Sequence, residues 1–205
     1  MCARFILLDE AEVAEIGRIV QEVGMKYDGK GISMKTGEIF PTDYAPVVSL
    51  ENGKPSLFLM KWGFPKPDGK GVVINARSET APQKRMFSAS FARRRCVIPS
   101  NGFIEWTKDR GNAKQKILFG ASDCPMLYMA GLYDSFPAEN EHEPLLDRFV
   151  ILTRQADESV GNMHSRMPVI LQKNEIRLWL TDTPFAKTIM SRDTAQLIHT
   201  AAEAA

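Results

Sequence analysis

The sequence predicts an α+β fold in which a mixed or antiparallel sheet curls into a barrel flanked by helices. Of the 205 residues, 44% are hydrophobic, which is enough for a well-buried core. Short apolar runs separated by polar or glycine-containing connections fill the middle of the chain, whereas helical spacing occurs towards its two ends. No linker, repeat or shift in composition divides the chain, so we expect one domain over residues 1–205.

The first elements are expected to be a helix and a hairpin. Apolar residues recur at helical spacing over residues 9–23, acidic residues stand in the first turn, and Gly24 follows as a stop. Strands 47–50 and 57–62 then flank residues 51–54, whose Asn-Gly pair suits a tight turn because both residues accept positive φ.

Later strands are expected wherever a short apolar run stands between polar connections. These strands are 96–98, 103–106, 117–119, 126–133, 149–153 and 167–171. Helical patterns return at residues 174–180 and 186–202.

Charge and cysteine content limit the function. With 26 basic and 25 acidic side chains the net charge is +1, so any DNA binding must use a local patch. Cys2, Cys96 and Cys124 form no CxxC pair, which argues against a disulfide framework and a cysteine zinc site. The apolar run at residues 5–8 is too short for a signal peptide or a membrane span. We expect a cytoplasmic protein with no membrane contact.

Cys2 directly follows the initiator methionine, so its α-amine and its thiol can react together. Removal of Met1 would leave a free α-amine and a thiol on one residue, a 1,2-aminothiol. An α-amine, with a reference pKa of about 7.7 to 8.0, is partly neutral at physiological pH and can attack an aldehyde. The thiol can then close a five-membered thiazolidine ring. The alternative is that Cys2 is simply a small residue in a frayed terminus.

Several motifs accompany Cys2 in a fixed order. They are the Met-Cys-x-Arg-Phe start, Trp62-Gly63, residues 75–79 (NARSE), 95–99 (RCVIP), 102–106 (GFIEW), 130–133 (AGLY), 151–153 (ILT) and 163–168 (MHSRMP). Together they resemble the SOS response-associated peptidase (SRAP) family over roughly residues 1–180.

The resemblance implies a catalytic set. Cys2 is the expected nucleophile, and Asn75 is expected to hold the sugar and the nucleophile in register, although a turn cap is an equal alternative. Glu105, in an apolar run, is the expected acid, because desolvation raises a carboxyl pKa; an exposed strand position is the alternative. His164 is expected to move protons, and a purely structural hydrogen bond is its alternative.

The resemblance also implies contacts to DNA. Arg4 and Arg77 are expected to contact phosphates, because a planar guanidinium matches two phosphate oxygens. Arg85 and Met86 belong to a basic stretch with interleaved apolar side chains that suits gripping a strand, although charge runs are often only solvated surface. Thr153 is expected to line the site, although a strand threonine needs no such role.

Two positions depart from the family pattern. Ala3 replaces the usual glycine and adds a methyl group beside the nucleophile. The segment 64–69 lacks the tryptophans that some relatives carry, so contacts to bases are expected to differ.

The expected function follows from the aminothiol and the resemblance. We expect a monomeric abasic site processing protein that senses abasic sites in single-stranded DNA and protects them during the DNA damage response through a thiazolidine crosslink to Cys2. It would need no cofactor and no metal, and the imine could support weak lyase activity. A cysteine peptidase or amidohydrolase with Cys2 as nucleophile, and a non-catalytic single-strand binder, remain as alternatives.

Overall fold

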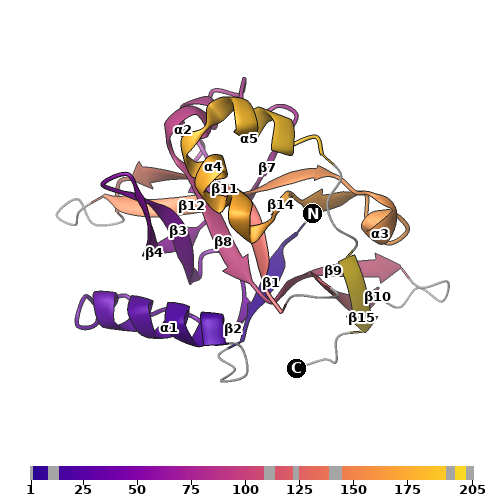
Figure 1. Ribbon diagram of the computed structural model, residues 1–205, viewed down its shortest axis with the longest axis horizontal. Helices are drawn as coiled ribbons and strands as arrows, with labels where there is room; N and C mark the ends of the chain where they lie inside the picture. The colour runs from indigo at the N-terminus through magenta and orange to yellow at the C-terminus, as the bar shows by residue number, and fades with distance from the viewer. Residues whose placement is uncertain are drawn as a thin grey trace.

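The computed structural model describes residues 2–8, 14–108, 114–121, 125–138, 145–192 and 197–201. Two curved sheets and a short two-stranded ribbon form the framework, and helices cover its ends (Figure 1). The α+β class and the barrel-like sheet expected from the sequence are confirmed.

Five strands of the larger sheet close into a barrel. They are β3 (Tyr44–Glu51), β4 (Lys54–Trp62), β8 (Arg95–Ser100), β11 (Leu127–Phe136) and β12 (Leu146–Gln155). Neighbours in the order β4-β3-β8-β11-β12 pair antiparallel, and β12 then pairs parallel with β4. Because β12 pairs with both β11 and β4, the ring of strands is closed.

Two short strands that carry predicted motifs pair with the carboxyl-terminal half of β12. There β7 (Asn75–Arg77) runs parallel to β12, and β13 (Arg166–Pro168) runs antiparallel to it. Nearby, β14 (Ile170–Leu171) pairs with β11, while β5 (Phe64–Pro65) and β6 (Val72–Val73) form the ribbon. The motifs at residues 75–79 and 163–168, far apart in sequence, therefore meet at one end of β12.

The smaller sheet has the order β15-β10-β9-β1-β2. Its strands are β1 (Arg4–Leu7), β2 (Gly37–Ile39), β9 (Gly102–Lys108), β10 (Lys114–Ala121) and β15 (Leu197–Ala201). Arg4 lies opposite Ile104 in the antiparallel pair of β1 and β9. This register brings the residues before Arg4 to the level of Glu105.

An aromatic cluster joins the two sheets. The indole of Trp62 on β4 stacks on Phe149 of β12, with ring centroids 6.1 Å apart, and Phe5 of β1 lies 5.1 Å from it. The indole nitrogen donates to the Ile74 carbonyl oxygen at 3.0 Å, which satisfies the buried polar group. This packing fixes β1, and with it Cys2, against the barrel.

The helices lie on opposite sides of the sheets. In Figure 1, α2 (Ser88–Arg93), α4 (Ile176–Thr181) and α5 (Thr183–Ile189) lie together at the top, and α1 (Ala14–Tyr27) lies below β3 and β4. The short α3 (Glu158–Gly161) precedes His164, and a 3-10 turn over Lys173–Glu175 leads into α4. Among the described residues, no helix is long and apolar enough to cross a membrane.

The hairpin and the later strands are confirmed, with longer bounds. Asn52 and Gly53 have φ of 52° and 75°, as the Asn-Gly turn predicts. The apolar segments over 96–98, 103–106, 117–119 and 149–153 lie within strands, and the segment 126–133 lies in β11 from Leu127 on. The predicted strand 167–171 is divided at Val169 into β13 and β14, and residues 174–180 lie in the 3-10 turn and α4.

Two helix bounds were wrong. The first helix does not stop at Gly24 but runs to Tyr27, because helical glycine is tolerated and its Cβ position meets no atom within 4 Å; the turn comes later, at Gly29 with φ 69°. Residues 9–13 of the predicted helix lie outside the described residues.

The predicted helix over 186–202 is wrong in its second half. The helical part is α5, which ends at Ile189, and Leu197–Ala201 instead form β15, which pairs with β10. The free edge of β10 supplies hydrogen bonds that outweigh local helical spacing. His199 accordingly lies on this strand, with its ring 5.9 Å from that of Phe119, rather than on a helix.

Candidate active site

Cys2 and Asn75 are joined by a direct hydrogen bond. The Asn75 side-chain amide on β7 donates from Nδ2 to the backbone carbonyl oxygen of Cys2 at 2.8 Å. Cys2 is fully buried, and its thiol donates to the carbonyl oxygen of Arg4 at 3.6 Å. The Oδ1 atom of Asn75 is buried without a hydrogen-bond partner among the described residues. Asn75 therefore fixes the backbone of Cys2 and keeps one acceptor for a further group.

Glu105 and His164 form the second pair of the site. His164 Nε2 lies 3.6 Å from Glu105 Oε2, and Glu105 lies on β9. Glu105 is only 4% exposed. A buried carboxylate beside an imidazole can accept a proton from it or return one, which is the arrangement that general acid–base chemistry requires.

The imidazole of His164 is oriented by the backbone of Arg166. The Arg166 amide nitrogen lies 3.1 Å from His164 Nδ1, and the Arg166 carbonyl oxygen lies 3.0 Å from the same atom. The amide can donate to an unprotonated Nδ1, and the carbonyl can accept from a protonated one. Either protonation state of the ring is therefore held, with Nε2 directed towards Glu105.

A clamp built on Arg166 was not predicted from the sequence. Its guanidinium binds the Glu79 carboxylate in a bidentate pair, at 2.6 and 3.0 Å. It also donates to the backbone oxygen of Thr153 at 2.5 Å and to Thr153 Oγ1 at 3.3 Å. Glu79 and Arg166 belong to two of the motifs already quoted, so opposite charges in paired motifs are the signal that could have found them.

Burial raises the pKa values of two groups of the site. Burial raises the pKa of the Cys2 thiol strongly, and the negative charge of Glu105 raises it further. Burial also raises the pKa of Glu105, while the charge of His164 opposes that shift. At neutral pH the thiol therefore keeps its proton, and Glu105 takes up a proton more readily than an exposed glutamate.

The predicted DNA contacts lie at three different places. Arg77 is exposed at the end of β7, and Arg85 is exposed in the turn before α2, where Met86 is half-buried against the core. Arg4 points from β1 to Glu38, with Nη1 to Oε1 at 3.1 Å. Thr153 is fully buried and is held by Arg166.

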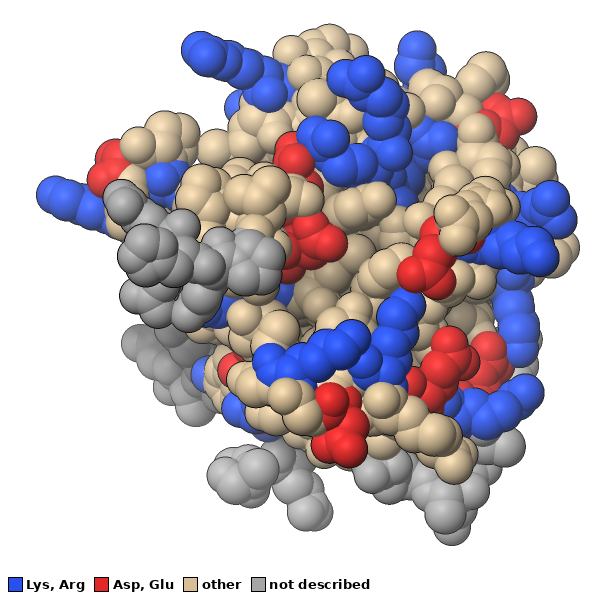
Figure 2. Space-filling model, turned by 90° about the vertical axis from the view of Figure 1, so that its left-hand side faces the viewer, with Lys and Arg blue, Asp and Glu red and all other residues tan. Residues whose placement is uncertain are grey.

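The surface carries no uniform basic field on the face drawn in Figure 2. Lys and Arg side chains are interspersed there with Asp and Glu side chains over the whole face (Figure 2). This distribution agrees with the net charge of +1 and limits DNA contacts to local groups.

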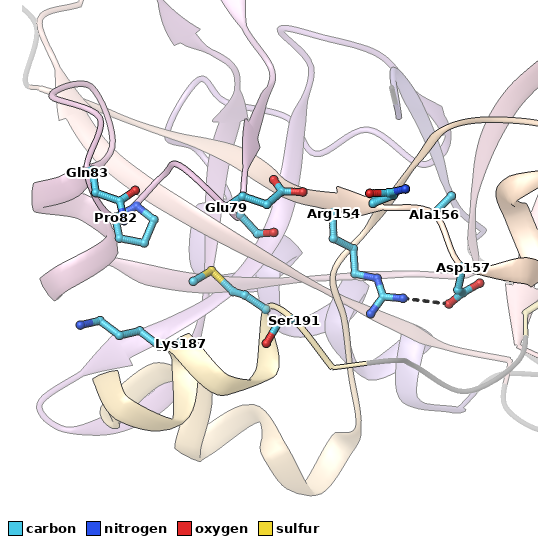
Figure 3. A pocket seen from close by; sticks show the side chains of 11 residues that line it. Glu79, Pro82, Gln83, Arg154, Ala156, Asp157, Lys187 and Ser191 are labelled. Carbon is cyan, nitrogen blue, oxygen red and sulfur yellow. Dashed lines mark hydrogen bonds and ion pairs between the residues drawn. The ribbon is translucent and has the colours of Figure 1, made fainter.

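A cavity of about 720 Å³ lies beside the clamp rather than at Cys2 (Figure 3). The turn around Pro82, the end of β12 and the end of α5 line it, and Arg154 pairs there with Asp157 at 3.1 Å. Glu79 reaches its edge, but Cys2, Glu105 and His164 do not line it. Cavity size alone would thus have missed the candidate site.

The described part of the chain contains no group of side chains that could bind a metal ion. No cluster of three or more His, Cys, Asp or Glu residues with ligand geometry occurs there. Cys96 is buried and unpaired, and Cys124 and His142 lie outside the described residues.

Comparison with known protein families identifies the family to which this chain belongs. The model of the SOS response-associated peptidase family (SRAP) matches residues 1–204. The chain belongs to the SRAP family. Its match covers the four residues of the candidate site, Cys2, Asn75, Glu105 and His164, and the clamp around them.

Several curated abasic site processing proteins are similar to the chain. Abasic site processing protein YoqW of Bacillus subtilis is 26% identical over 200 residues, which cover 93% of this chain and 86% of that protein. YedK of Escherichia coli is 33% identical over 120 residues, covering 58% of this chain and 52% of that protein. HMCES of Xenopus tropicalis is 29% identical over 169 residues, covering 70% and 49%.

Solved structures share the SRAP fold of this chain. A protein from Bacteroides thetaiotaomicron aligns with a TM-score of 0.79 and 21% identity, covering 98% of this chain and 92% of that one. A protein from Bordetella bronchiseptica aligns with a TM-score of 0.76 and 23% identity, covering 99% and 100%.

Proposed function

We propose that this SRAP protein processes abasic sites in single-stranded DNA by bonding covalently to the ring-opened sugar through Cys2. Removal of Met1 frees the α-amine of Cys2, and the amine and thiol together capture the aldehyde as a thiazolidine. The crosslink would shield the lesion from strand scission during the DNA damage response. Curated relatives named as abasic site processing proteins support this reading.

One observation carries the proposal: the backbone of Cys2, and not only its thiol, is held at the site. Asn75 binds the Cys2 carbonyl at 2.8 Å, and the Glu105–His164 pair lies close enough for the Glu105 charge to act on the thiol. Holding the Cys2 carbonyl also orients the α-amine, because both groups are bonded to the same Cα, and this orientation favours attack by the amine.

The proposed chemistry begins with opening of the sugar. The hydroxyl proton on the anomeric carbon leaves to Glu105 or His164 while the ring oxygen gains a proton, which gives the aldehyde. The Cys2 amine adds to that carbon, and the resulting hydroxyl departs as water after protonation by the Glu105–His164 pair. An imine is left.

The thiol then closes the ring. Its sulfur bonds to the imine carbon, and the thiol proton passes through Glu105 to the nitrogen, so that aldehyde and aminothiol yield a thiazolidine and one water. In this proposal the sulfur follows the amine, because ring closure uses the imine carbon as its electrophile. If the imine instead loses a proton from the neighbouring carbon, β-elimination follows, which accounts for weak lyase activity.

The same features disfavour a cysteine peptidase. Such an enzyme attacks with a thiolate activated by an adjacent base. Here burial and Glu105 raise the thiol pKa, and the thiol hydrogen bond goes to the Arg4 carbonyl oxygen. His164 Nε2 instead faces Glu105.

A gel experiment tests the proposed function. Met1-processed protein is mixed with single-stranded DNA carrying one abasic site and is run under denaturing conditions. We expect a shifted, heat-stable band that requires both the lesion and Cys2. A Cys2→Ala variant, intact DNA, and protein whose α-amine has been acetylated serve as controls.

The controls separate the three candidate functions. Loss of the band on acetylation supports amine chemistry. A band that survives acetylation, or peptide cleavage that needs Cys2, would favour a thiol nucleophile. Salt-sensitive binding without any covalent band would leave only a single-strand binder.

A further inference from the structure

A salt bridge joins the two short strands that flank the end of β12. The Glu79 carboxylate, two residues after β7, binds Nη1 and Nη2 of Arg166, the first residue of β13. Both strands pair with β12, β7 parallel to it and β13 antiparallel to it. The salt bridge therefore spans β12 and connects the strand that carries Asn75 with the segment that carries His164.

The salt bridge is anchored in the backbone of β12. The carbonyl oxygen of Thr153 accepts from the Ser78 amide at 2.8 Å and from Arg166 Nη2 at 2.5 Å. One peptide oxygen is thus shared by the segment after β7 and by a side chain from β13. Hydrogen bonds from Arg166 and from the Gln155 backbone lower the pKa of Glu79, although desolvation opposes them. Glu79 is therefore charged at neutral pH and bonded to donors from β12 and β13.

The backbone of Arg166 holds the imidazole of the candidate site. Its amide nitrogen and its carbonyl oxygen lie 3.1 and 3.0 Å from His164 Nδ1. Arg166 also lies opposite Gln155 at the base of the loop that carries His164, and the Ala156 amide donates to the Ser165 carbonyl oxygen there at 3.0 Å. Because one ring nitrogen contacts both backbone groups of Arg166, a displacement of Arg166 would displace the imidazole.

The form of this ion pair suits positioning better than stabilisation. A bidentate contact between a guanidinium and a carboxylate fixes direction as well as distance. The Glu79 side chain is 48% exposed, and an ion pair that solvent reaches contributes little to the free energy of unfolding. The contribution of Glu79 should therefore lie in the geometry that it imposes on Arg166.

We propose that Glu79 is a positioning residue, which acts through Arg166 to hold the His164 imidazole in register with Cys2 and Asn75. The inference rests on the proposed function and deepens it, since it assigns a role to a residue that does not itself move a proton or bond to the sugar. A misplacement of about 1 Å at a reacting group can cost on the order of 100-fold in rate. A distant ion pair can therefore matter to the reaction.

A double-mutant cycle tests whether Glu79 acts through His164. Single-turnover crosslinking of Met1-processed protein is measured at saturating abasic single-stranded DNA. Glu79→Ala should slow the parent about tenfold, and Glu79→Gln, which keeps one accepting oxygen, about threefold. In a His164→Gln background, Glu79→Ala should change the rate less than about twofold, because no imidazole is left to misplace. An equal slowing in both backgrounds would overturn the inference.

Binding measurements separate positioning from contacts to phosphate. The affinity is measured with a fluorescent single strand that carries a tetrahydrofuran abasic analogue, which has no aldehyde and cannot crosslink. We expect the rate defect of Glu79→Ala to persist at DNA concentrations far above this dissociation constant, as the loss of an oriented reacting group requires. Tighter binding together with a parental rate at saturation would overturn the inference, because Glu79 would then only neutralise a cation that contacts DNA.

A second bidentate pair supplies the matched control. Arg192 binds the two carboxylate oxygens of Glu175 at 2.5 and 3.0 Å, compared with 2.6 and 3.0 Å for Arg166 and Glu79. Glu175→Gln removes the same kind of ion pair and should crosslink at the parental rate below its unfolding temperature. Equal slowing by Glu175→Gln and Glu79→Gln would overturn the inference, because the rate would then follow general stability.

Nuclear magnetic resonance reports on the imidazole without any reaction. The sequence has three histidines, so the ring-nitrogen signals of His164 can be assigned by their loss in His164→Gln. Glu79→Gln should shift these signals and Glu175→Gln should not. Unshifted signals in Glu79→Gln would overturn the inference. If Glu79→Ala fails to fold, as thermal unfolding would show, Glu79→Gln replaces it in the cycle.

Failure of this inference can be distinguished from failure of the proposed function. A parent protein that forms no crosslink would overturn the proposed function, while the ring-nitrogen signals would still show whether Glu79 holds His164. A parent protein that crosslinks, with Glu79→Ala crosslinking at the same rate, would overturn the inference alone and leave the Arg166–Glu79 pair as a structural contact.

Discussion

At the scale of single residues, Asn75 links the strand β7 to the nucleophile. Its amide nitrogen donates to the Cys2 carbonyl, and its buried oxygen keeps an acceptor position open. Removing this bond should leave the barrel intact, because Asn75 contributes its backbone, and not its side chain, to the pairing with β12.

We therefore expect Asn75→Ala to slow crosslinking about tenfold at saturating abasic DNA while the circular dichroism spectrum stays unchanged. The loss corresponds to one hydrogen bond that orients the amine. Single-turnover rates from denaturing gels give the comparison. An unaltered rate would show that Cys2 needs no support from Asn75.

The burial of Glu105 should make the free energy of unfolding depend on pH. Burial raises its pKa above the unfolded value, so between those two values the native protein binds more protons than the unfolded chain. The free energy of unfolding then falls as pH rises through that window. We expect Glu105→Gln to unfold at a higher temperature than the parent at pH 8, with the difference shrinking towards pH 4, and to crosslink roughly 100-fold more slowly.

Glu175 supplies a control of opposite sign for these unfolding curves. Desolvation opposes the shift, but hydrogen bonds from Arg192 lower its pKa overall. Its contribution to stability is therefore present above the unfolded pKa and is lost as pH falls. Glu175→Gln should unfold at a lower temperature near pH 7, and a parallel response of the two variants would argue against the burial of Glu105.

The resemblance to the SRAP family named the residues of the candidate site in the sequence, and Cys2 was also singled out by its own chemistry. Cys2 follows Met1, and Glu105 and His164 are titratable groups in recognisable motifs. The Arg166–Glu79 clamp was not reached, because it depends on β7 and β13 lying on either side of β12. The position of Arg4 beside Glu38 likewise depends on strand register, which single-residue chemistry does not encode.

At the scale of elements, three neighbouring strands of the barrel, β8, β11 and β12, pack closely at Gly131. A Cβ added there would lie 2.4 Å from Ile98 Cδ1 and 2.8 Å from the backbone oxygen of Val150. The backbone oxygen cannot move away as a flexible side chain end can. This close approach explains why a glycine stands in the middle of a buried strand.

Gly131→Ala should accordingly destabilise the protein by about 2 kcal/mol, the typical cost of overpacking. Gly120→Ala is the matched control, because its Cβ would meet only the Asn101 oxygen, at 3.5 Å, and should be neutral or slightly stabilising. Urea unfolding gives both values. Equal stability of the two variants would contradict the close packing of the neighbouring strands around Gly131.

Elements were predicted well where local pattern and tertiary pairing agree. The hairpin of β3 and β4 has an Asn-Gly turn whose φ angles match its sequence. The strand β15 was missed, because its pairing with β10 outweighs the helical spacing of the terminal segment. The short β1, β2 and β7 gave too little periodicity to be recognised, yet β1 and β7 carry Cys2 and Asn75 to the site.

At the scale of the whole molecule, the two sheets bring distant parts of the sequence to the start of β1. The overall charge is nearly balanced, so general attraction to DNA should be weak. Arg4, Arg77 and Arg85 are the arginines that the sequence predicts to contact phosphates.

We expect undamaged single-stranded DNA to bind with a slope of log affinity against log salt of roughly −2 to −3, which corresponds to three or four phosphates at about 0.7 each. Fluorescence anisotropy over a range of NaCl concentrations measures it. A slope much steeper than this would mean that a broader basic surface takes part. Once formed, the crosslink should resist added salt.

The central claim is that both groups of Cys2 are consumed, and mass spectrometry of the crosslinked amino-terminal peptide tests it most directly. We expect the peptide to lack Met1, to carry the abasic sugar with loss of one water, and to gain no hydrogen on borohydride treatment, as a thiazolidine requires. A peptide with a free α-amine, a thiol that still alkylates, or a linkage at another residue would contradict it.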